Sequence, residues 1–181
     1  MSNGRLIAIV GPSGVGKDSV MSGIINANPT IQLVRRIITR APDMGGEDYE
    51  AVTAQQFFDL QEDGAFCVSW QAHGLCYGIP ADVLSDVRNG ATCIVNFSRS
   101  ALTQAAEIFP ELRVLNITAS PSELVKRLVD RGRENENEIK RRLAQAAKPL
   151  PDDIDITHIH NDGPLDETVQ AALAALQPVR A

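Results

Sequence analysis

The chain has 181 residues, 44% of them hydrophobic, and a formal net charge of −6 at pH 7, so we expect one well-buried domain over residues 1–181. The acidic balance, without a basic stripe interleaved with aromatic residues, argues against a nucleic-acid partner. No apolar run approaches the ~18 residues of a membrane span, no signal-peptide pattern opens the chain, and the cysteines lack metal-ligand spacing, so we expect a cytoplasmic protein without a membrane partner.

The first predicted elements are a strand, a loop and a helix. An apolar run at residues 6–10 precedes a glycine-rich loop, and a helical segment covers residues 17–27. The glycines let the backbone direct its N–H groups inward, the helix N-terminus adds a positive dipole end, and the lysine can reach the β- and γ-phosphates. The pattern predicts an ATP site formed by Gly11, Pro12, Ser13, Gly14, Val15, Gly16, Lys17, Asp18 and Ser19.

One position departs from the usual phosphate loop. A serine or threonine that binds Mg²⁺ normally follows the lysine, whereas this chain has Asp18. A carboxylate is a hard oxygen ligand that suits Mg²⁺ directly or through water, but an aspartate in a first helical turn also suits the helix dipole. Both interpretations stay open, and Asp18 is the candidate metal ligand.

Strands and helices alternate over the rest of the chain. We expect strands at residues 31–39, 66–70, 75–79, 92–97, 112–117 and 154–159, and helices at residues 54–61, 81–88, 101–108, 120–130, 136–147 and 165–176. Such alternation predicts a parallel sheet with helices on both faces, whose ligands bind at the carboxyl ends of the strands. The phosphate loop, Arg40 and residues 96–99 and 161–162 fall at such ends, so we expect them to share one cleft.

Positive charge is concentrated late in the chain. Eight of the 17 basic residues lie between positions 126 and 148: Lys126, Arg127, Arg131, Arg133, Lys140, Arg141, Arg142 and Lys148. In an acidic protein such a cluster suits a local anion, which the phosphate loop would supply. The alternative is a solvated helix face with pairs such as Glu138 with Arg142.

Several short motifs extend over nearly the whole chain. They are the phosphate loop, Thr39-Arg40, Gly46-Glu47 with Tyr49, His73-Gly74 with Tyr77-Gly78, Arg131-Gly132-Arg133, Arg141-Arg142-Leu143 and Asn161-Asp162. Together they resemble the guanylate kinase pattern. The resemblance implies a three-layer P-loop kinase fold with a central parallel sheet, an acceptor-binding insertion over about residues 36–80 and a helical lid over about residues 131–137.

The same resemblance implies roles for individual side chains. Arg40, Tyr49 and Tyr77 are expected to bind an acceptor phosphate. The residues expected to act on the transferring phosphoryl group are Lys17, Arg131, Arg133 and Arg142.

Departures from the family concern the acceptor. Guanylate kinases read the guanine base with a glutamate and an aspartate at places where this chain has Ser69 and Ser98. A second acceptor-phosphate arginine is replaced by Asp43, and the first carboxylate after the central strand by Asn96. A site built to hydrogen-bond a base loses its discrimination without those partners, so GMP is not the expected acceptor.

A narrower set of motifs accounts for these departures. Gly-Lys-Asp-Ser at 16–19, Ile-Thr-Arg at 38–40, Ser69-Trp70, Val95-Asn96 with Ser98-Arg99, and Asn161-Asp162-Gly163 are similar to the ribose 1,5-bisphosphate phosphokinases, a guanylate-kinase-like branch. That resemblance implies transfer of the γ-phosphoryl of ATP, with Mg²⁺, onto the 1-phosphate of ribose 1,5-bisphosphate, which gives 5-phosphoribosyl 1-pyrophosphate (PRPP) in phosphonate catabolism.

Under this interpretation the partners are small molecules. We expect Arg40 and Arg99 to hold the acceptor, and Asn96 to orient a metal-bound water or a substrate hydroxyl. Arg36 is either a further acceptor ligand or a solvated strand residue. A guanylate kinase or another nucleoside monophosphate kinase is the second interpretation. A catalytically silent binding module is the third, which the intact Lys17 and loop glycines disfavour.

Overall fold

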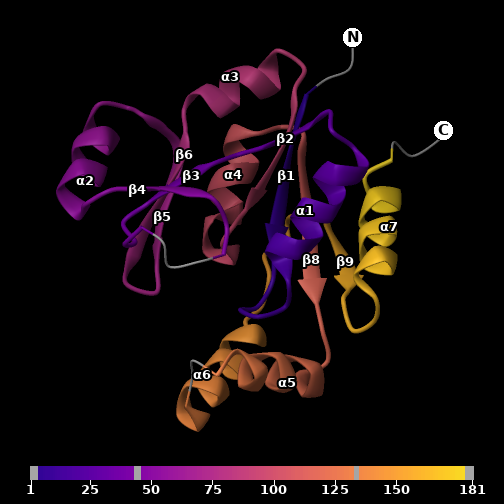
Figure 1. Cartoon of the computed structure of the whole chain (residues 1–181). Coiled ribbons are helices and arrows are strands. Elements are labelled where there is room, and N and C mark those ends of the chain that lie inside the picture. The colour runs from indigo at the N-terminus through magenta and orange to yellow at the C-terminus, as the bar shows by residue number, and fades with distance from the viewer. Residues whose placement is uncertain (1–3, 43–45, 133–134, 178–181) are drawn as a thin grey trace.

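The computed structural model describes residues 4–42, 46–132 and 135–177. Its core is a five-stranded sheet in the order β2 (Ile31–Leu33), β7 (Thr92–Asn96), β1 (Arg5–Val10), β8 (Leu112–Thr118) and β9 (Ile156–His160), with every neighbouring pair parallel. The expected parallel α/β sheet is therefore confirmed. The carboxyl ends of β1, β7 and β8 lie at one edge of the sheet (Figure 1).

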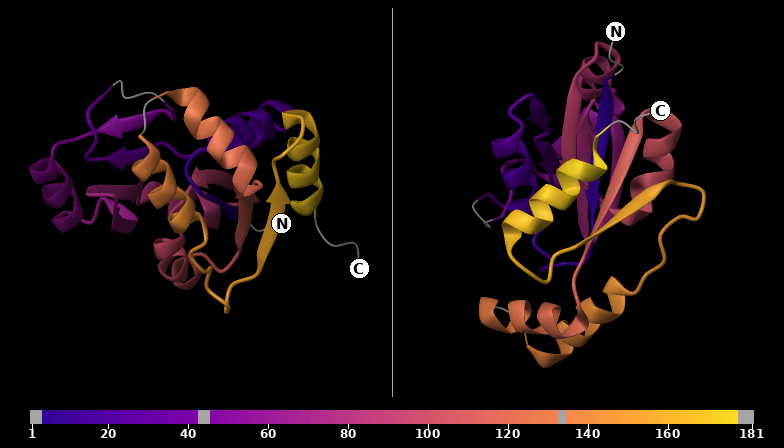
Figure 2. Two further views of the ribbon diagram at one scale, coloured as in Figure 1. Left: turned by 90° about the horizontal axis from the view of Figure 1, so that it is seen from below. Right: turned by 90° about the vertical axis from the view of Figure 1, so that its right-hand side faces the viewer.

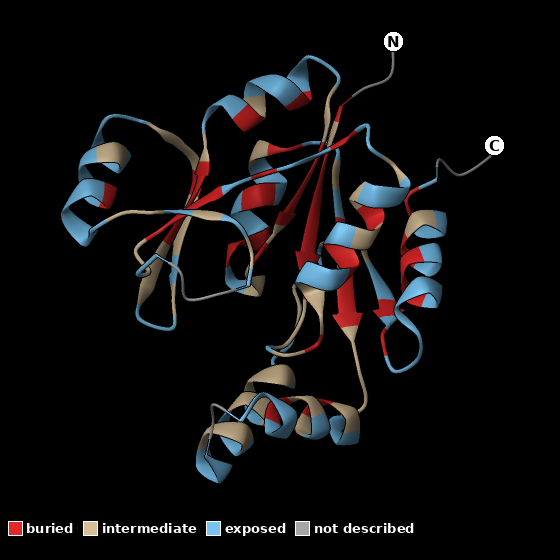
Figure 3. Cartoon of the chain, viewed as in Figure 1, coloured by how far each residue is buried: buried red, intermediate tan, exposed pale blue. Residues whose placement is uncertain are grey.

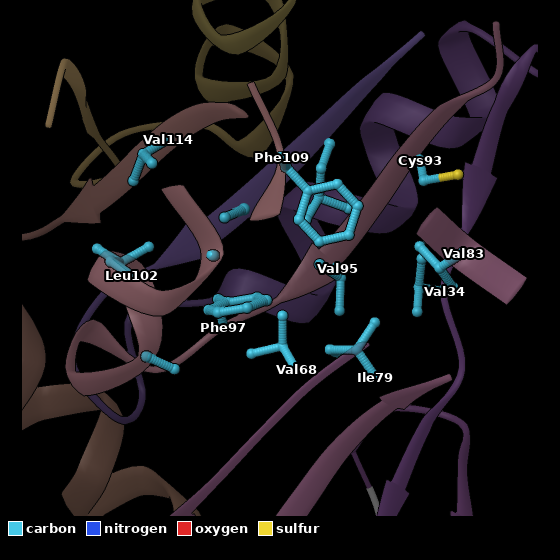
Figure 4. Close-up of a cluster of buried hydrophobic side chains, with 14 of the residues drawn as sticks. Val34, Val68, Ile79, Val83, Cys93, Val95, Phe97, Leu102, Phe109 and Val114 are labelled. Atoms are coloured by element: carbon cyan, nitrogen blue, oxygen red, sulfur yellow. The ribbon is translucent and has the colours of Figure 1, made fainter. Parts of the chain in front are cut away.

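Helices cover both faces of the core sheet, because alternate residues of each strand point to opposite sides. Ile7 and Ile9 pack in a cluster with α1 (Lys17–Ala27) and α7 (Leu165–Ala175). Leu6 and Ala8 pack in a second cluster with α3 (Asp82–Arg88) and α4 (Leu102–Ile108), which Figure 4 shows around Phe109 and Val95. The buried strands lie between largely exposed outer helix faces (Figure 3).

A second sheet lies beside the core sheet, to its left in Figure 1. Its order is β4 (Tyr49–Ala51), β3 (Arg36–Ile38), β6 (Leu75–Pro80) and β5 (Phe66–Ala72), and α2 (Ala54–Glu62) belongs to the same segment. We call this four-stranded sheet the acceptor sheet, because it spans the residues to which the sequence assigns acceptor binding.

The single strand expected at residues 31–39 is wrong. β2 pairs with β7 in the core, whereas β3 pairs with β4 and β6 in the acceptor sheet. Val34 still donates its N–H to the carbonyl of Ile94 at 2.9 Å, and the chain then crosses to the other sheet. The crossing has no sequence signal, because no glycine or proline interrupts this largely apolar run.

A pair of helices, α5 (Pro121–Arg131) and α6 (Glu136–Ala146), projects from the end of β8 below the core sheet (Figures 1 and 2). Ser120 caps α5 by accepting from the N–H of Glu123, and Asn135 and Glu138 form a reciprocal capping box on α6. Gly132 ends α5 in the left-handed conformation, with φ of 62°. None of the helices in the described ranges has the length and apolar character needed to cross a membrane.

Candidate active site

The loop between β1 and α1 has a backbone that requires glycine at its turns. Gly14 and Gly16 have φ of 84° and 96°, in the left-handed region that side chains disfavour. A Cβ on Gly16 would also lie 2.8 Å from Nδ2 of Asn161, so a larger residue would displace that amide. The loop predicted from the glycine spacing is present and packs directly against the segment that follows β9.

Two side chains hold the carbonyl of Val15 in the middle of the loop. Asn161 donates from Nδ2 at 2.8 Å, and Arg127 donates from Nη1 at 3.0 Å. The Nη2 of Arg127 also bonds the carbonyl of Asn161 at 2.6 Å, its Nε bonds Glu123 at 2.9 Å, and Thr168 donates to Oδ1 of Asn161 at 2.7 Å. We call Arg127 and Asn161 the loop clamp. The sequence pattern singles out Arg127 as part of the basic cluster and Asn161 as part of a motif, but it assigns no role to Arg127.

Lys17 folds back onto its own loop. Its Nζ donates to the carbonyls of Gly11 and Pro12, at 2.9 and 3.2 Å. Desolvation by burial lowers the pKa of Lys17 to about 8, although the neighbouring Asp18 carboxylate opposes the shift. The lysine therefore lies at the centre of the loop, as a phosphate ligand must.

Charged residues from several other segments lie near Lys17. Arg36 and Arg99 also lower its pKa, whereas Glu47 raises it. These charges come from β3, from the 3-10 turn η1 (Arg99–Ala101) and from the segment before β4. Residues of β3, of the segment before β4 and of the turn after β7 therefore lie near the phosphate loop.

Asp18 lies in the first turn of α1 beside two other segments. Its Oδ1 accepts from Nδ2 of Asn96 at 3.4 Å, and a Cβ built on Gly46 would lie 3.6 Å from its Oδ2. In the described part of the chain no cluster of three or more His, Cys, Asp or Glu side chains could hold a metal. One carboxylate beside an amide suits Mg²⁺, because this ion keeps several waters and takes its other ligands from substrate phosphates.

Arg40 and Tyr49 lie together at the edge of the acceptor sheet. The guanidinium carbon of Arg40 is 4.2 Å from the centre of the Tyr49 ring, and the Tyr49 hydroxyl donates to the carbonyl of Ala41. The Nε of Arg40 is buried and, among the described residues, has no hydrogen-bond partner. Leaving such a donor unpaired costs about 1–3 kcal/mol, so this position is suited to an anionic ligand.

Tyr77 is only 9% exposed and stacks on Trp70. Arg36 is buried as well and forms an ion pair with Glu47. The solvated alternative for Arg36 is therefore wrong. Burial raises the pKa of the Tyr77 hydroxyl, so it remains a hydrogen-bond donor at neutral pH.

Arg99, which the sequence assigns to the acceptor, contacts the end of α6. Its Nη1 lies 2.8 Å from the carbonyl of Lys148 and 3.1 Å from that of Ala146. Cations favour helix C-termini, where carbonyls lack intrahelical partners. An acceptor contact would have to use the rest of its guanidinium.

The arginines of the helical pair differ in placement. Arg142 of α6 donates from Nη1 to the Ser13 hydroxyl of the phosphate loop at 2.6 Å. Arg131 is exposed at the last position of α5, and Arg133 lies outside the described residues. The helical pair therefore already contacts the loop through Arg142.

Comparison with known proteins agrees with this geometry. The family model described as guanylate kinase matches residues 3–177. The chain is 48% identical to the ribose 1,5-bisphosphate phosphokinase PhnN of Ruegeria sp. (strain TM1040), covering 99% of this chain and 95% of that protein. It is 43% identical to the protein of the same name from Agrobacterium fabrum, with 95% and 96% covered.

Two further relatives differ in extent or in sequence. The chain covers 29% of a bifunctional ribose 1,5-bisphosphokinase-thymidine phosphorylase of Cupriavidus pinatubonensis, at 37% identity over 97% of this chain. Among solved structures, a guanylate kinase from Anaplasma phagocytophilum superimposes with a TM-score of 0.70 at 18% identity, covering 97% of this chain and 86% of that one. At that identity the likeness shows the fold, which is that of a P-loop kinase.

Proposed function

The chain belongs to the guanylate kinase family and to its ribose 1,5-bisphosphate phosphokinase branch, and we propose that it phosphorylates the 1-phosphate of ribose 1,5-bisphosphate with ATP. The observation that carries the proposal is an intact phosphate loop in a chain 48% identical over 99% of its length to an enzyme of that name. The products are PRPP and ADP, in phosphonate catabolism. We place this activity in the cytoplasm, within a single kinase domain.

The acceptor positions support a sugar phosphate over a nucleotide. Ser69 and Ser98 occupy the places where a guanylate kinase would have base-reading carboxylates. The Ser69 hydroxyl accepts from Gln61 at 3.0 Å, and the Ser98 hydroxyl lies 3.0 Å from that of Ser100. Both hydroxyls are engaged locally, and neither carries the negative charge that guanine recognition uses.

The reaction requires alignment and charge neutralisation. An oxygen of the acceptor 1-phosphate attacks the γ-phosphorus in line, the bond to the β,γ-bridging oxygen breaks, and ADP leaves with that electron pair. The acceptor is already ionised near neutral pH, so no strong base is needed. Two unit charges at 4 Å repel by ~4 kcal/mol at an effective dielectric of 20, which cationic side chains must offset.

Lys17 and the helical pair supply that offset in our proposal. Lys17 exchanges its contacts with loop carbonyls for the β- and γ-phosphates, and Arg142 of α6 lies at the loop through Ser13. We propose that α5 and α6 act as a lid, with residues 131–137 at its tip, so that Arg131 and Arg133 reach the transferring group on closure. Closure would also exclude water from the phosphates.

Asp18 and Asn96 would hold Mg²⁺ together with substrate phosphate oxygens, because the carboxylate and the amide already meet at 3.4 Å. The bound cation would neutralise charge on the β- and γ-phosphates. The Nε of Arg40, which has no hydrogen-bond partner among the described residues, is the strongest candidate ligand for an acceptor phosphate. Tyr49, Tyr77 and Arg99 complete the proposed acceptor set.

The proposal is tested by incubating the protein with MgATP and ribose 1,5-bisphosphate, ribose 5-phosphate or GMP. We expect ADP release only with ribose 1,5-bisphosphate, because ribose 5-phosphate lacks the attacking 1-phosphate and GMP carries a base that the site does not read. ADP release with GMP instead would establish the nucleoside monophosphate kinase alternative.

A further inference from the structure

The acceptor sheet contains a buried ion pair to which the phosphoryl transfer gives no role. Arg36 is 6% exposed and donates from Nε to Oε2 of Glu47 at 3.0 Å, while its Nη2 donates to Oε1 of the same carboxylate. Removing two charges from water costs so much that a buried pair adds little net stability relative to apolar side chains of similar volume. Stability alone therefore does not account for this pair.

The guanidinium of Arg36 covers an aromatic surface. Trp70 and Tyr77 are cross-strand neighbours in β5 and β6, with ring planes 6° from parallel and centres 5.4 Å apart. The guanidinium carbon lies 4.9 Å from the Tyr77 centre and 5.9 Å from the Trp70 centre, so it lies over both rings. Phe97, from the end of β7, also stacks on Trp70 at 4.8 Å.

This covered surface lies near the phosphate loop. Glu47 directly follows Gly46, whose position is in contact range of the Asp18 carboxylate at the start of α1. The charges of both Arg36 and Glu47 also act on Lys17. An acceptor lying between Lys17 and Tyr77 would therefore meet the ion pair.

We propose that the Arg36–Glu47 pair determines acceptor specificity by occupying the place over Tyr77 and Trp70 that a stacked nucleobase would take. A base would have to displace a guanidinium held by cation–π contact and by two hydrogen bonds, and would leave the Glu47 carboxylate, whose side chain is only 15% exposed, without its partner. A sugar phosphate without a base needs no such space. The inference rests on the proposed function, in which the acceptor has no base. The absence of base-reading carboxylates removes attraction for guanine, and the ion pair would in addition exclude any nucleobase by occupying its place.

The test measures binding with the donor site filled by a non-hydrolysable ATP analogue. The probes are GMP and ribose 5-phosphate, and the signal is the fluorescence of Trp70, the only tryptophan. The opened variant is Arg36→Ala with Glu47→Gln, which removes the guanidinium without leaving an unpaired charge. The matched control is Arg35→Ala with Asp48→Asn, a neighbouring pair at 3.2 Å whose side chains are 57% and 74% exposed.

We expect the wild type to bind GMP at least about tenfold more weakly than ribose 5-phosphate, the opened variant to lose that preference by tightening GMP, and the control pair to behave as wild type. Arg36→Met with Glu47→Gln refills the volume without charge, and we expect it to reject GMP again.

Three results would overturn the proposal. The first is wild-type protein that binds GMP as tightly as ribose 5-phosphate, a result that requires no variant to fold. The second is an opened variant with an unchanged preference. The third is an opened variant whose affinities for ribose 5-phosphate and for GMP both fall by the same factor, which would make Arg36 a phosphate ligand. No turnover is measured, so failure to form PRPP would count against the proposed function and leave this test intact.

Discussion

The amide of Asn161 donates to the carbonyl of Val15 at 2.8 Å, and this buried contact joins the segment after the last strand to the phosphate loop 146 residues earlier. Arg127 bonds the same carbonyl from α5. The loop is therefore held by one side chain from the helical pair and by another from the segment after β9. Its shape depends on distant residues as well as on its own glycines.

Loss of the loop clamp is expected to weaken ATP binding. Arg127→Ala removes two charge-assisted hydrogen bonds to backbone carbonyls, of about 1.5–3 kcal/mol each, and the ion pair with Glu123, so we expect a KM for ATP raised about tenfold or more and a Tm lowered by a few degrees. Lys126→Ala is the control, because Lys126 is the exposed neighbour on the same helix. An unchanged KM for ATP in Arg127→Ala would remove the clamp from nucleotide binding.

The lowered pKa of Lys17 predicts a pH dependence of ATP affinity. Below pH 8 the ammonium is present in the free protein; above it, binding requires proton uptake, because phosphate contact favours the charged form. The Kd for ATP should then rise by up to about tenfold per pH unit above pH 8. Lys17→Arg keeps its charge throughout this range and should flatten the profile. Calorimetric titrations with parallel profiles for the two proteins would contradict this role.

Asp18 is expected to set the Mg²⁺ requirement. Asp18→Asn should raise the Mg²⁺ concentration for half-maximal rate several-fold, and Asp18→Ser should recover part of the activity by restoring the usual hydroxyl. Asp82→Asn, in the first turn of α3, is the matched control for the helix dipole, which contributes about 0.3–1 kcal/mol. If both Asn variants lose a little stability and keep wild-type Mg²⁺ titrations, Asp18 stabilises the N-terminus of α1 and does not bind Mg²⁺.

Arg142 is expected to act on the phosphates through its charge. Arg142→Ala should lower kcat about 10- to 1,000-fold with a smaller change in the KM for ATP, because the guanidinium counters charge that develops during transfer. Ser13→Ala removes the hydroxyl that Arg142 bonds in this structure but keeps the guanidinium, so its kcat should fall much less than that of Arg142→Ala. Equal losses in the two variants would mean that Arg142 only braces the loop.

The sequence predicted helices and strands well where glycine, asparagine or proline residues mark their ends. The helix expected at residues 17–27 coincides with α1, since Gly16 precedes it and Asn28-Pro29 follows it. The crossing between β2 and β3 could not be predicted, because the run from Ile31 to Thr39 contains no turn residue.

The same limit applies to the candidate site. Strand ends predicted that the phosphate loop and residues 96–99 would lie together, and the structure has Asn96 and Asp18 in contact. Strand ends could not predict that Arg99 would bond the carbonyls at the end of α6, or that Arg36 would find Glu47 rather than solvent. Those contacts depend on how segments far apart in the chain pack together. Residue type and spacing predict local elements and do not predict that packing.

The most direct test of the central claim is the product itself. Phosphorus NMR of a reaction with MgATP and ribose 1,5-bisphosphate should show the 1-phosphate signal replaced by the two coupled signals of a pyrophosphate on C1, with one ADP formed per product and none of either with Lys17→Ala. A sugar bisphosphate that stays unchanged while the same enzyme converts GMP to GDP would contradict the account.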